Sequence, residues 1–145
     1  MQLTDSLSVS NSPCPCGSGR VYAACCGPLH DGSVSASTAQ QLMRSRYSAY
    51  VLRNEAYLLQ TWDPSTRPTA IDFPDDLTWI RLEIRKTKKG GVGDKKGIVE
   101  FRALYRCQGQ NRIFEETSRF QREGQTWFYL SGIVKPSRPE INSKY

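Results

Sequence analysis

The spacing of hydrophobic residues along this chain changes once, near residue 77. Before that point, apolar side chains recur at the three- and four-residue intervals of an amphipathic helix, at Leu42, Met43, Tyr47, Tyr50 and Val51. Thr38 followed by Gln41 has the pattern of a capping box at the start of this helix. We expect Asn54 to end it and to cap a second short helix, which the Asp63-Pro64 pair would stop.

After residue 77, apolar positions alternate with polar ones, which is the pattern of half-buried β-strands. The sets expected to share a face are Ile80, Leu82 and Ile84, then Val99, Phe101, Ala103 and Tyr105, then Phe114 and Phe120, then Trp127 and Tyr129. Turn-forming residues at 108–111 and 123–124 separate the last three runs. The pattern therefore predicts an α+β fold, with two helices followed by about four antiparallel strands.

Length, composition and charge bear on the number of domains, the cellular location and the partners of this protein. The 145 residues leave room for one domain with a short appendage. No apolar run approaches the ~20 residues that span a bilayer. The first residues lack the basic and apolar segments of a secretory signal, so we expect a cytoplasmic protein with reduced cysteines. The net charge of +6 favours acidic or polyanionic partners.

Four of the five cysteines form one block, Cys14, Cys16, Cys25 and Cys26. Four thiolates satisfy the tetrahedral demand of one structural Zn²⁺ ion and leave no open position for a catalytic water. A redox dithiol and unliganded buried cysteines are the alternatives. A disulfide between the two adjacent cysteines would be strained, which disfavours the redox alternative.

The single histidine and the fifth cysteine are interpreted differently from the four clustered cysteines. His30 follows the block by four positions, and we expect it beside the site or at the surface, since four thiolates are already present. Cys107 stands alone near the end of a predicted strand and is expected to pack as a small hydrophobic residue.

These patterns divide the chain into four parts: a disordered tail at 1–13, a zinc-binding module at 14–32, the α+β domain at 36–134 and an extended tail at 135–145. The cysteine block resembles the SEC-C motif, best known at the C-terminus of the preprotein translocase ATPase SecA. That motif runs Cys-x-Cys, Ser-Gly, then Cys followed by Cys or His, and each part has a counterpart here.

The following domain resembles the YchJ family of small bacterial proteins. The resemblance rests on residues 42–50, Tyr57-Leu58, Thr61-Trp62, Ser118-Arg119-Phe120 and 127–129. It implies an NTF2-like fold, in which a curved sheet wraps on helices to form a cone with an open pocket. Many such proteins carry a second cysteine module at the C-terminus. Residues 135–145 contain no cysteine, so we expect one zinc module to act alone.

A pocket of this kind raises the question of catalysis, which needs an acid or base in a dry cavity. The candidates are Asp63, Glu115 and Glu116, with Arg44, Arg46 and Arg119 as electrostatic partners and Trp62 among the neighbouring aromatics. We favour the interpretation that these arginines lock the helix to the sheet. The sequence contains no phosphate loop, serine elbow or paired-carboxylate motif, so an enzyme is not the expectation.

A basic segment at 81–97 is a candidate for contact with RNA or an acidic protein surface. It contains Arg81, Arg85, Lys86, Lys88, Lys89, Lys95 and Lys96 among four glycines, the composition of a flexible hairpin loop. The alternative is a solvated turn protected by lysines.

The leading functional hypothesis is a non-enzymatic adaptor, whose zinc module, flanked by Arg20, contacts a macromolecular partner. By resemblance to SecA, that partner would be a secretion chaperone or a ribosome-associated component. A small-molecule-binding or hydrolytic NTF2-like domain is the alternative, and RNA binding through 81–97 is the second alternative.

Overall fold

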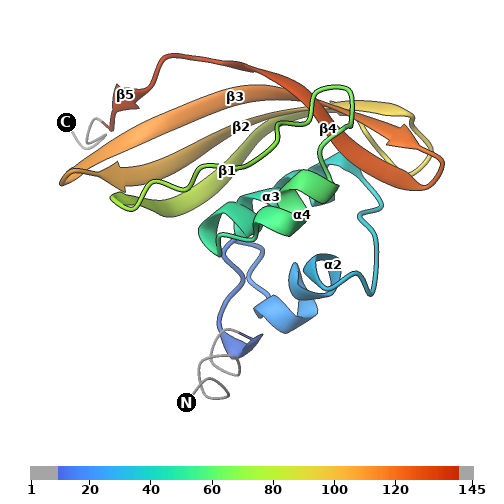
Figure 1. The fold of residues 1–145 in the computed structure, drawn as a ribbon, viewed down its shortest axis with the longest axis horizontal. Helices are drawn as coiled ribbons and strands as arrows, with labels where there is room; N and C mark the ends of the chain where they lie inside the picture. Colours follow the sequence, from blue (N-terminus) through green and yellow to red (C-terminus); the bar gives the residue numbers. More distant parts are fainter. Residues whose placement is uncertain (1–9, 141–145) are drawn as a thin grey trace.

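The structure, a computed structural model, describes residues 10–140; residues 1–9 and 141–145 of the two expected tails lie outside it. Short helices come first and long strands follow (Figure 1). The elements are η1 (Tyr22–Ala24), α2 (Gly27–His30), α3 (Ala39–Val51), α4 (Glu55–Gln60), β1 (Leu77–Lys89), β2 (Lys96–Cys107), β3 (Gln110–Glu123), β4 (Thr126–Val134) and β5 (Arg138–Pro139). Within the described range, no helix has the length and apolar character to cross a membrane.

Side-chain caps set the starts of the two main helices, as expected. The Thr38 hydroxyl accepts a hydrogen bond from the Gln41 backbone N–H at 3.1 Å and begins α3. The Gln41 side chain accepts a return bond at 2.7 Å from the N–H of Ser37, one residue before the cap. The Asn54 side chain accepts from the Tyr57 N–H and begins α4. Both caps satisfy N–H groups that have no partner within the helix.

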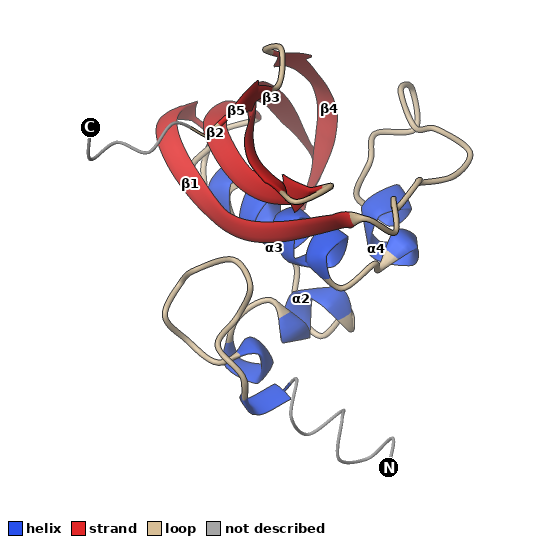
Figure 2. Cartoon of the chain, turned by 90° about the vertical axis from the view of Figure 1, so that its left-hand side faces the viewer, coloured by secondary structure: helices blue, strands red, loops and turns tan. Residues whose placement is uncertain are grey.

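The strands form an antiparallel sheet in the order β1-β2-β3-β4, with β5 also paired to β3. Strand β4 pairs with the second half of β3, from Glu116 to Glu123, whereas β5 pairs with Arg112 and Ile113 in the first half. The sheet curves over α3, while α2 and the cysteine loop lie on the opposite side of that helix (Figures 1 and 2). This arrangement confirms the predicted NTF2-like α+β fold.

The main core lies between the concave face of the sheet and the helices. Its buried side chains come from both layers and include Leu42, Met43, Tyr47, Leu58, Val99, Phe101, Ala103, Phe120 and Trp127. The inward positions of β2 therefore match the predicted alternation. Burying these apolar surfaces is the main contribution that holds the sheet on α3.

The prediction of which β1 residues face the core is wrong at the start of this strand. Ile80 was predicted to share a face with Leu82, yet Ile80 is 43% exposed and Trp79 packs on the core instead. The pairing with β2 shifts between Trp79 and Arg81, which is a β-bulge. An extra residue in one strand reverses the alternation on either side of it, so Trp79 and Leu82 face the same way.

The structure adds contacts at two boundaries of the expected parts and differs from expectation in one loop. The N-terminal module begins before Cys14, because Pro13 forms a β-bridge with Val21 and the Ser12 carbonyl accepts from the Tyr22 N–H. The segment after residue 134 contains β5. The basic segment 81–97 is mostly strand rather than a flexible loop, and only residues 90–95 separate β1 from β2.

Candidate functional site

The four clustered cysteines converge into one compact set of sulfur atoms. The four Sγ atoms all lie within 4.8 Å of one another, and those of Cys16 and Cys25 are 3.6 Å apart. Four thiolates bound tetrahedrally at ~2.3 Å from a zinc ion would stand about 3.8 Å apart. The donor set therefore fits a four-coordinate metal that prefers sulfur ligands.

A tight reversal of the backbone brings the two cysteine pairs together. Gly17 and Gly19 have φ angles of 81° and 89°, in the left-handed region that glycine adopts without a steric penalty. The loop closes with a hydrogen bond of 2.8 Å from the Cys14 N–H to the Arg20 carbonyl.

Helix α3 supplies the polar side chains on which the cysteine loop rests. The Ser48 hydroxyl lies 3.5 Å from the sulfur of Cys14 and donates to that of Cys26 at 3.3 Å. Arg44 donates from Nη1 to the Cys16 carbonyl at 2.7 Å. Arg44 and Ser48 are four residues apart and so lie on the same face of the helix. Sequence reasoning missed Ser48, although this spacing beside Arg44 could have indicated it.

His30 joins the module to α3 and is not among the clustered donors. Its Nε2 lies 2.8 Å from the Ser45 carbonyl, which can only accept, so Nε2 carries the proton. Its Nδ1 therefore accepts from the Tyr22 hydroxyl at 2.6 Å. Burial lowers the pKa of His30 and favours this neutral form.

The electrostatics of the four sulfur atoms favour a bound cation. Hydrogen bonds from the thiols of Cys16 and Cys26 hold the pKa of Cys14 well below its usual range. The contact with Cys14 raises the pKa of both partners, since a second negative charge would stand beside the first. A metal ion relieves this repulsion and allows the remaining thiols to ionise.

A second site lies between α3 and the concave face of the sheet. It is a partly enclosed cavity of about 280 Å³. Aromatic and apolar side chains form most of its wall, and the polar members are Arg46, Glu116 and Ser118. The aromatic members are Tyr47, Tyr50, Trp62, Trp79, Phe101, Phe114 and Tyr129. The sheet curves over α3 (Figure 2), and both layers contribute side chains to the cavity wall.

Arg46 is buried in the wall of this cavity. It donates from Nη1 to the Leu58 carbonyl at 2.8 Å and to the Thr61 hydroxyl at 2.7 Å. Its guanidinium carbon lies 5.0 Å from the ring centre of Trp62 and 4.7 Å from that of Tyr129. Burial lowers the pKa of Arg46, and the two rings offset part of that penalty by cation–π attraction.

Glu116 places a carboxylate in the same wall. Its Oε2 accepts from the Ser118 hydroxyl at 2.6 Å and from the Tyr129 hydroxyl at 2.8 Å. The side chain has room because residue 132 is glycine, where a Cβ atom would collide with the carboxylate. Of the three candidate acids in the sequence, Glu116 alone lines the cavity.

The predicted polar cluster does not form as one group. Arg46 and Trp62 line the cavity, whereas Arg44 contacts the cysteine loop. Asp63 is buried outside the cavity, where it accepts from Ser65 and Gln121. Arg119 is exposed on the outer face of the sheet, because its neighbours Ser118 and Phe120 face inward.

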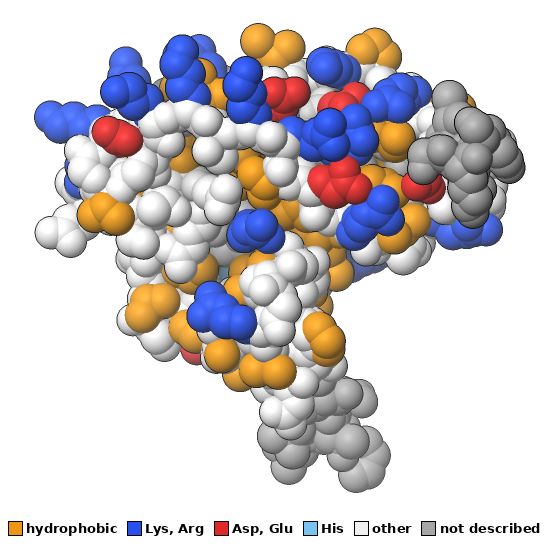
Figure 3. Space-filling view, turned by 180° about the vertical axis from the view of Figure 1, so that it is seen from behind, with side chains coloured by type: hydrophobic (Ala, Val, Ile, Leu, Met, Phe, Trp, Pro, Cys, Tyr) orange, Lys and Arg blue, Asp and Glu red, His pale blue; other side chains and the backbone are white. Residues whose placement is uncertain are grey.

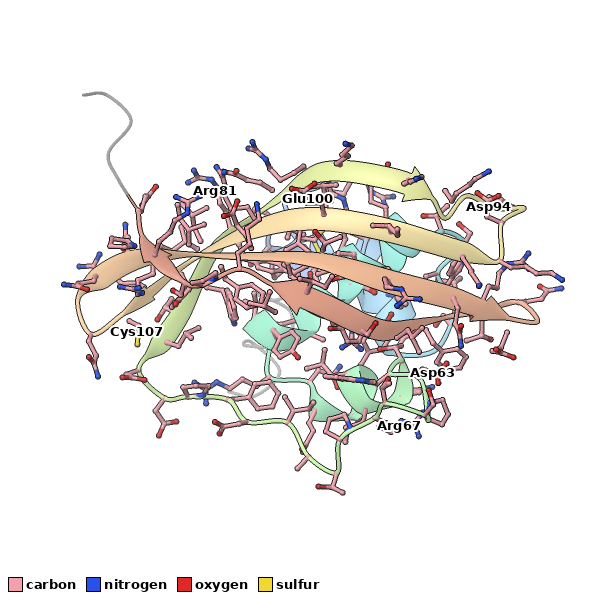
Figure 4. All side chains as sticks on the ribbon, turned by 90° about the horizontal axis from the view of Figure 1, so that it is seen from above. Asp63, Arg67, Arg81, Asp94, Glu100 and Cys107 are labelled. Carbon is pink, nitrogen blue, oxygen red and sulfur yellow. The ribbon has the colours of Figure 1, made fainter. Side chains whose placement is uncertain are left out.

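Glu115 and Cys107 also lie outside the cavity. Glu115 pairs with Arg102 and Arg138. Cys107 is the last residue of β2 and is labelled in Figure 4. It belongs to neither buried cluster, and its sulfur lies 3.7 Å from Oδ2 of Asp76.

Five of the seven basic residues of 81–97 fall into two groups. Lys and Arg side chains form a row on the outer face of the sheet (Figure 3). Arg81 and Arg85 both pair with Glu83. Figure 4 looks onto this face and shows Arg81 and Glu100 over β1 and β2. At the turn end of the sheet, a shallow groove is lined by Lys88, Lys89 and Lys96 with Arg119, and none of the described residues that line it is acidic.

Comparisons with known proteins agree with this geometry. A family model described as "YchJ, middle NTF2-like domain" matches residues 38–132, and a SEC-C motif model matches residues 11–28. Fold and site together thus define an NTF2-like domain that carries an N-terminal SEC-C motif.

A UPF0225 protein of Streptomyces avermitilis is 50% identical over 119 residues, 82% of each chain. A UPF0225 protein of Chromobacterium violaceum is 48% identical and covers 86% of this chain and 95% of the relative. The chain belongs to the YchJ family.

Two solved structures share the architecture. A SEC-C motif containing protein from Rhodopseudomonas palustris, solved in solution, superposes with a TM-score of 0.74 at 33% identity over 83% of this chain and 96% of that one. The crystal structure of a SEC-C motif containing protein from Psychrobacter arcticus gives a TM-score of 0.72 at 26% identity, over 90% and 86% of the two chains.

Proposed function

We propose that this protein is a cytoplasmic, non-enzymatic adaptor, in which one structural Zn²⁺ ion shapes the SEC-C module for contact with a macromolecular partner. The supporting observation is the set of four sulfur atoms within 4.8 Å of one another. Four thiolates complete the coordination of zinc and leave no position for substrate or water. The metal would therefore stabilise a recognition surface rather than take part in catalysis.

One side of the module is available for recognition. Contacts of Arg44 and Ser48 attach the cysteine loop to α3. Residues 17–21, on the loop between the cysteine pairs, are all exposed and carry one charge, on Arg20. Val21 beside it is 41% exposed. The proposed metal would hold this loop in one conformation, with the charge of Arg20 next to the apolar side chain of Val21. Such a surface is complementary to an acidic protein surface, such as that of a secretion chaperone or ribosome-associated component.

Affinity capture with matched charge reversals tests this role. The zinc-loaded protein, Arg20→Glu and Arg85→Glu are compared, since Arg85 is also an exposed arginine but lies on the outer face of β1. The proposal expects a partner that is captured by the native protein and Arg85→Glu and is lost with Arg20→Glu. Capture that is unchanged by Arg20→Glu contradicts it.

The metal is tested separately, by elemental analysis and thiol titration of protein purified under reducing conditions. One zinc per chain with four thiols protected from modification is the expected result. Substoichiometric metal with all five cysteines reactive contradicts the zinc assignment.

A second candidate function is polyanion binding, such as to RNA, through the groove of Lys88, Lys89, Lys96 and Arg119. None of the described residues that line this groove is acidic, which favours this candidate. Binding of a single-stranded RNA should weaken steeply with salt and lose about one unit of salt slope in Lys96→Gln. RNA binding that is absent, or insensitive to salt, excludes this candidate.

A further inference from the structure

The cavity under the sheet has the dimensions of a small-molecule site and is separate from the proposed adaptor surface. Its volume of about 280 Å³ is close to the lower end of the ~300–1,000 Å³ range of protein ligand pockets. A mostly aromatic wall with a few polar groups at one side is also typical of such pockets. A single aromatic ring is the size of occupant that this space suits.

The polar side of the wall begins with a buried cation. Among residues 10–140, Arg46 forms no ion pair with a carboxylate within 4.0 Å. Both of its assigned hydrogen bonds come from Nη1. A guanidinium has five N–H donors, so Nη2 and Nε remain able to bind an acceptor. Buried arginines are usually paired, and an acceptor on a ligand would complete this one.

The same wall provides an acceptor on the other side of Tyr129. The ring of Tyr129 stacks on Arg46, while its hydroxyl donates to Oε2 of Glu116. The second hydroxyl contact, from Ser118, also reaches Oε2. Oε1 of Glu116 therefore remains able to accept from a donor in the cavity. The wall thus presents a donor and an acceptor, more than 4.0 Å apart.

The charges of these two groups restrict the ligand. A carboxylate ligand would gain from Arg46 but would meet the like charge of Glu116. An amine cation would gain from Glu116 but would meet Arg46. In a largely apolar cavity such repulsion is poorly screened. A neutral group with one acceptor and one donor at its edge satisfies both residues.

We propose that this cavity binds a small neutral aromatic molecule with an amide-type edge, whose carbonyl accepts from Arg46 and whose N–H donates to Glu116. The ring would pack among the aromatic side chains of the wall. Trp62 also lines the cavity. Its Nε1 is shielded from solvent and has no hydrogen-bond partner in the described structure, so it is a further donor without an acceptor.

Isothermal titration of the full, zinc-loaded protein with a matched series of one-ring probes tests this site. Benzamide carries the neutral edge, benzoate the anion, benzylamine the cation, and acetamide has the edge without the ring. The expected order places benzamide at least about tenfold tighter than the other three. Undetectable benzamide binding, or equal affinity for benzamide and benzoate, overturns the proposal.

Two variants locate the binding. Glu116→Gln removes one charge with little change of shape, so benzoate affinity should rise about tenfold while benzylamine does not gain. Ala103→Leu fills the cavity from β2 and should abolish benzamide binding, whereas Ala70→Leu, at an exposed position, should leave it unchanged. Probe selectivity that is identical in the native protein and Glu116→Gln contradicts the assignment even where Ala103→Leu does not fold.

Discussion

Gly132 shows how strongly one residue can depend on a distant partner in the sequence. A Cβ at this position would overlap the carboxylate of Glu116, which Ser118 and Tyr129 hold in place. Gly132→Ala is therefore expected to displace the Glu116 side chain and to disturb its buried hydrogen bonds. We expect it to lower the free energy of unfolding by about 1–3 kcal/mol, measured by urea denaturation. Gly93→Ala is the matched control, because a Cβ there meets nothing within 4 Å, and equal stability of the two variants would show that Glu116 relaxes freely.

Asp63 contributes to stability through its charge. Hydrogen bonds from the side chain and backbone N–H of Ser65, with a further one from Gln121, lower the pKa of Asp63. The folded chain therefore binds this proton more weakly than the unfolded chain, so the contribution is present above pH ~4 and is lost as pH falls through the folded pKa.

Asp63→Asn is expected to cost about 1 kcal/mol at neutral pH. The difference from the native protein should shrink below pH ~4, in denaturation measured across pH. Asp72→Asn, at an exposed position, serves as the control. A difference that does not depend on pH would assign the effect to packing rather than to charge.

At the scale of elements, the N-terminal cap of α3 is the feature on which both sites depend. Helix α3 carries both the cavity residue Arg46 and the residues that hold the cysteine loop, so its first turn supports both sites. Thr38 caps that turn. We expect Thr38→Ala to destabilise the protein by about 1 kcal/mol and Thr38→Ser to restore most of this loss, measured by thermal denaturation. Equal losses in both variants would indicate that the threonine methyl group, not the cap, stabilises α3.

At the scale of the whole molecule, the metal is expected to join two parts that would otherwise pack weakly. Within the described residues, the cysteine loop has a small buried cluster of its own, formed mostly by the cysteines. Removal of zinc by a chelator should therefore unfold the module, and should lower the melting temperature of the domain through loss of the Ser48 and Arg44 contacts.

Variants and pH distinguish this coupling from a general effect of the chelator. Cys26→Ser should reproduce the loss without chelator, whereas Cys107→Ser should not, because Cys107 lies outside the cluster. Zinc should also dissociate as pH falls, since protons compete for the thiolates. A melting temperature that is independent of zinc in the native protein contradicts this prediction.

Much of this molecule can be inferred from local patterns. The spacing of the four cysteines predicted one site because the ligands are close in sequence and two glycines allow the reversal. Helix caps and the alternation of buried and exposed positions in strands could also be predicted, since each depends on contacts within a few residues. Periodicity failed at Ile80, where a bulge moves Trp79 to the core face. A bulge depends on pairing with another strand and leaves little signal in its own segment.

The sequence by itself determined the clustering of the four cysteines, the order of elements and the α+β class. The tertiary structure alone decided that Ser48 supports the cysteine loop, that Arg119 faces solvent, and that Arg46 and Glu116 share a cavity. The physical reason is the distance along the chain over which each contact forms. Short-range patterns encode helices, strands and a compact cysteine cluster, whereas a cavity depends on how a curved sheet closes over a helix.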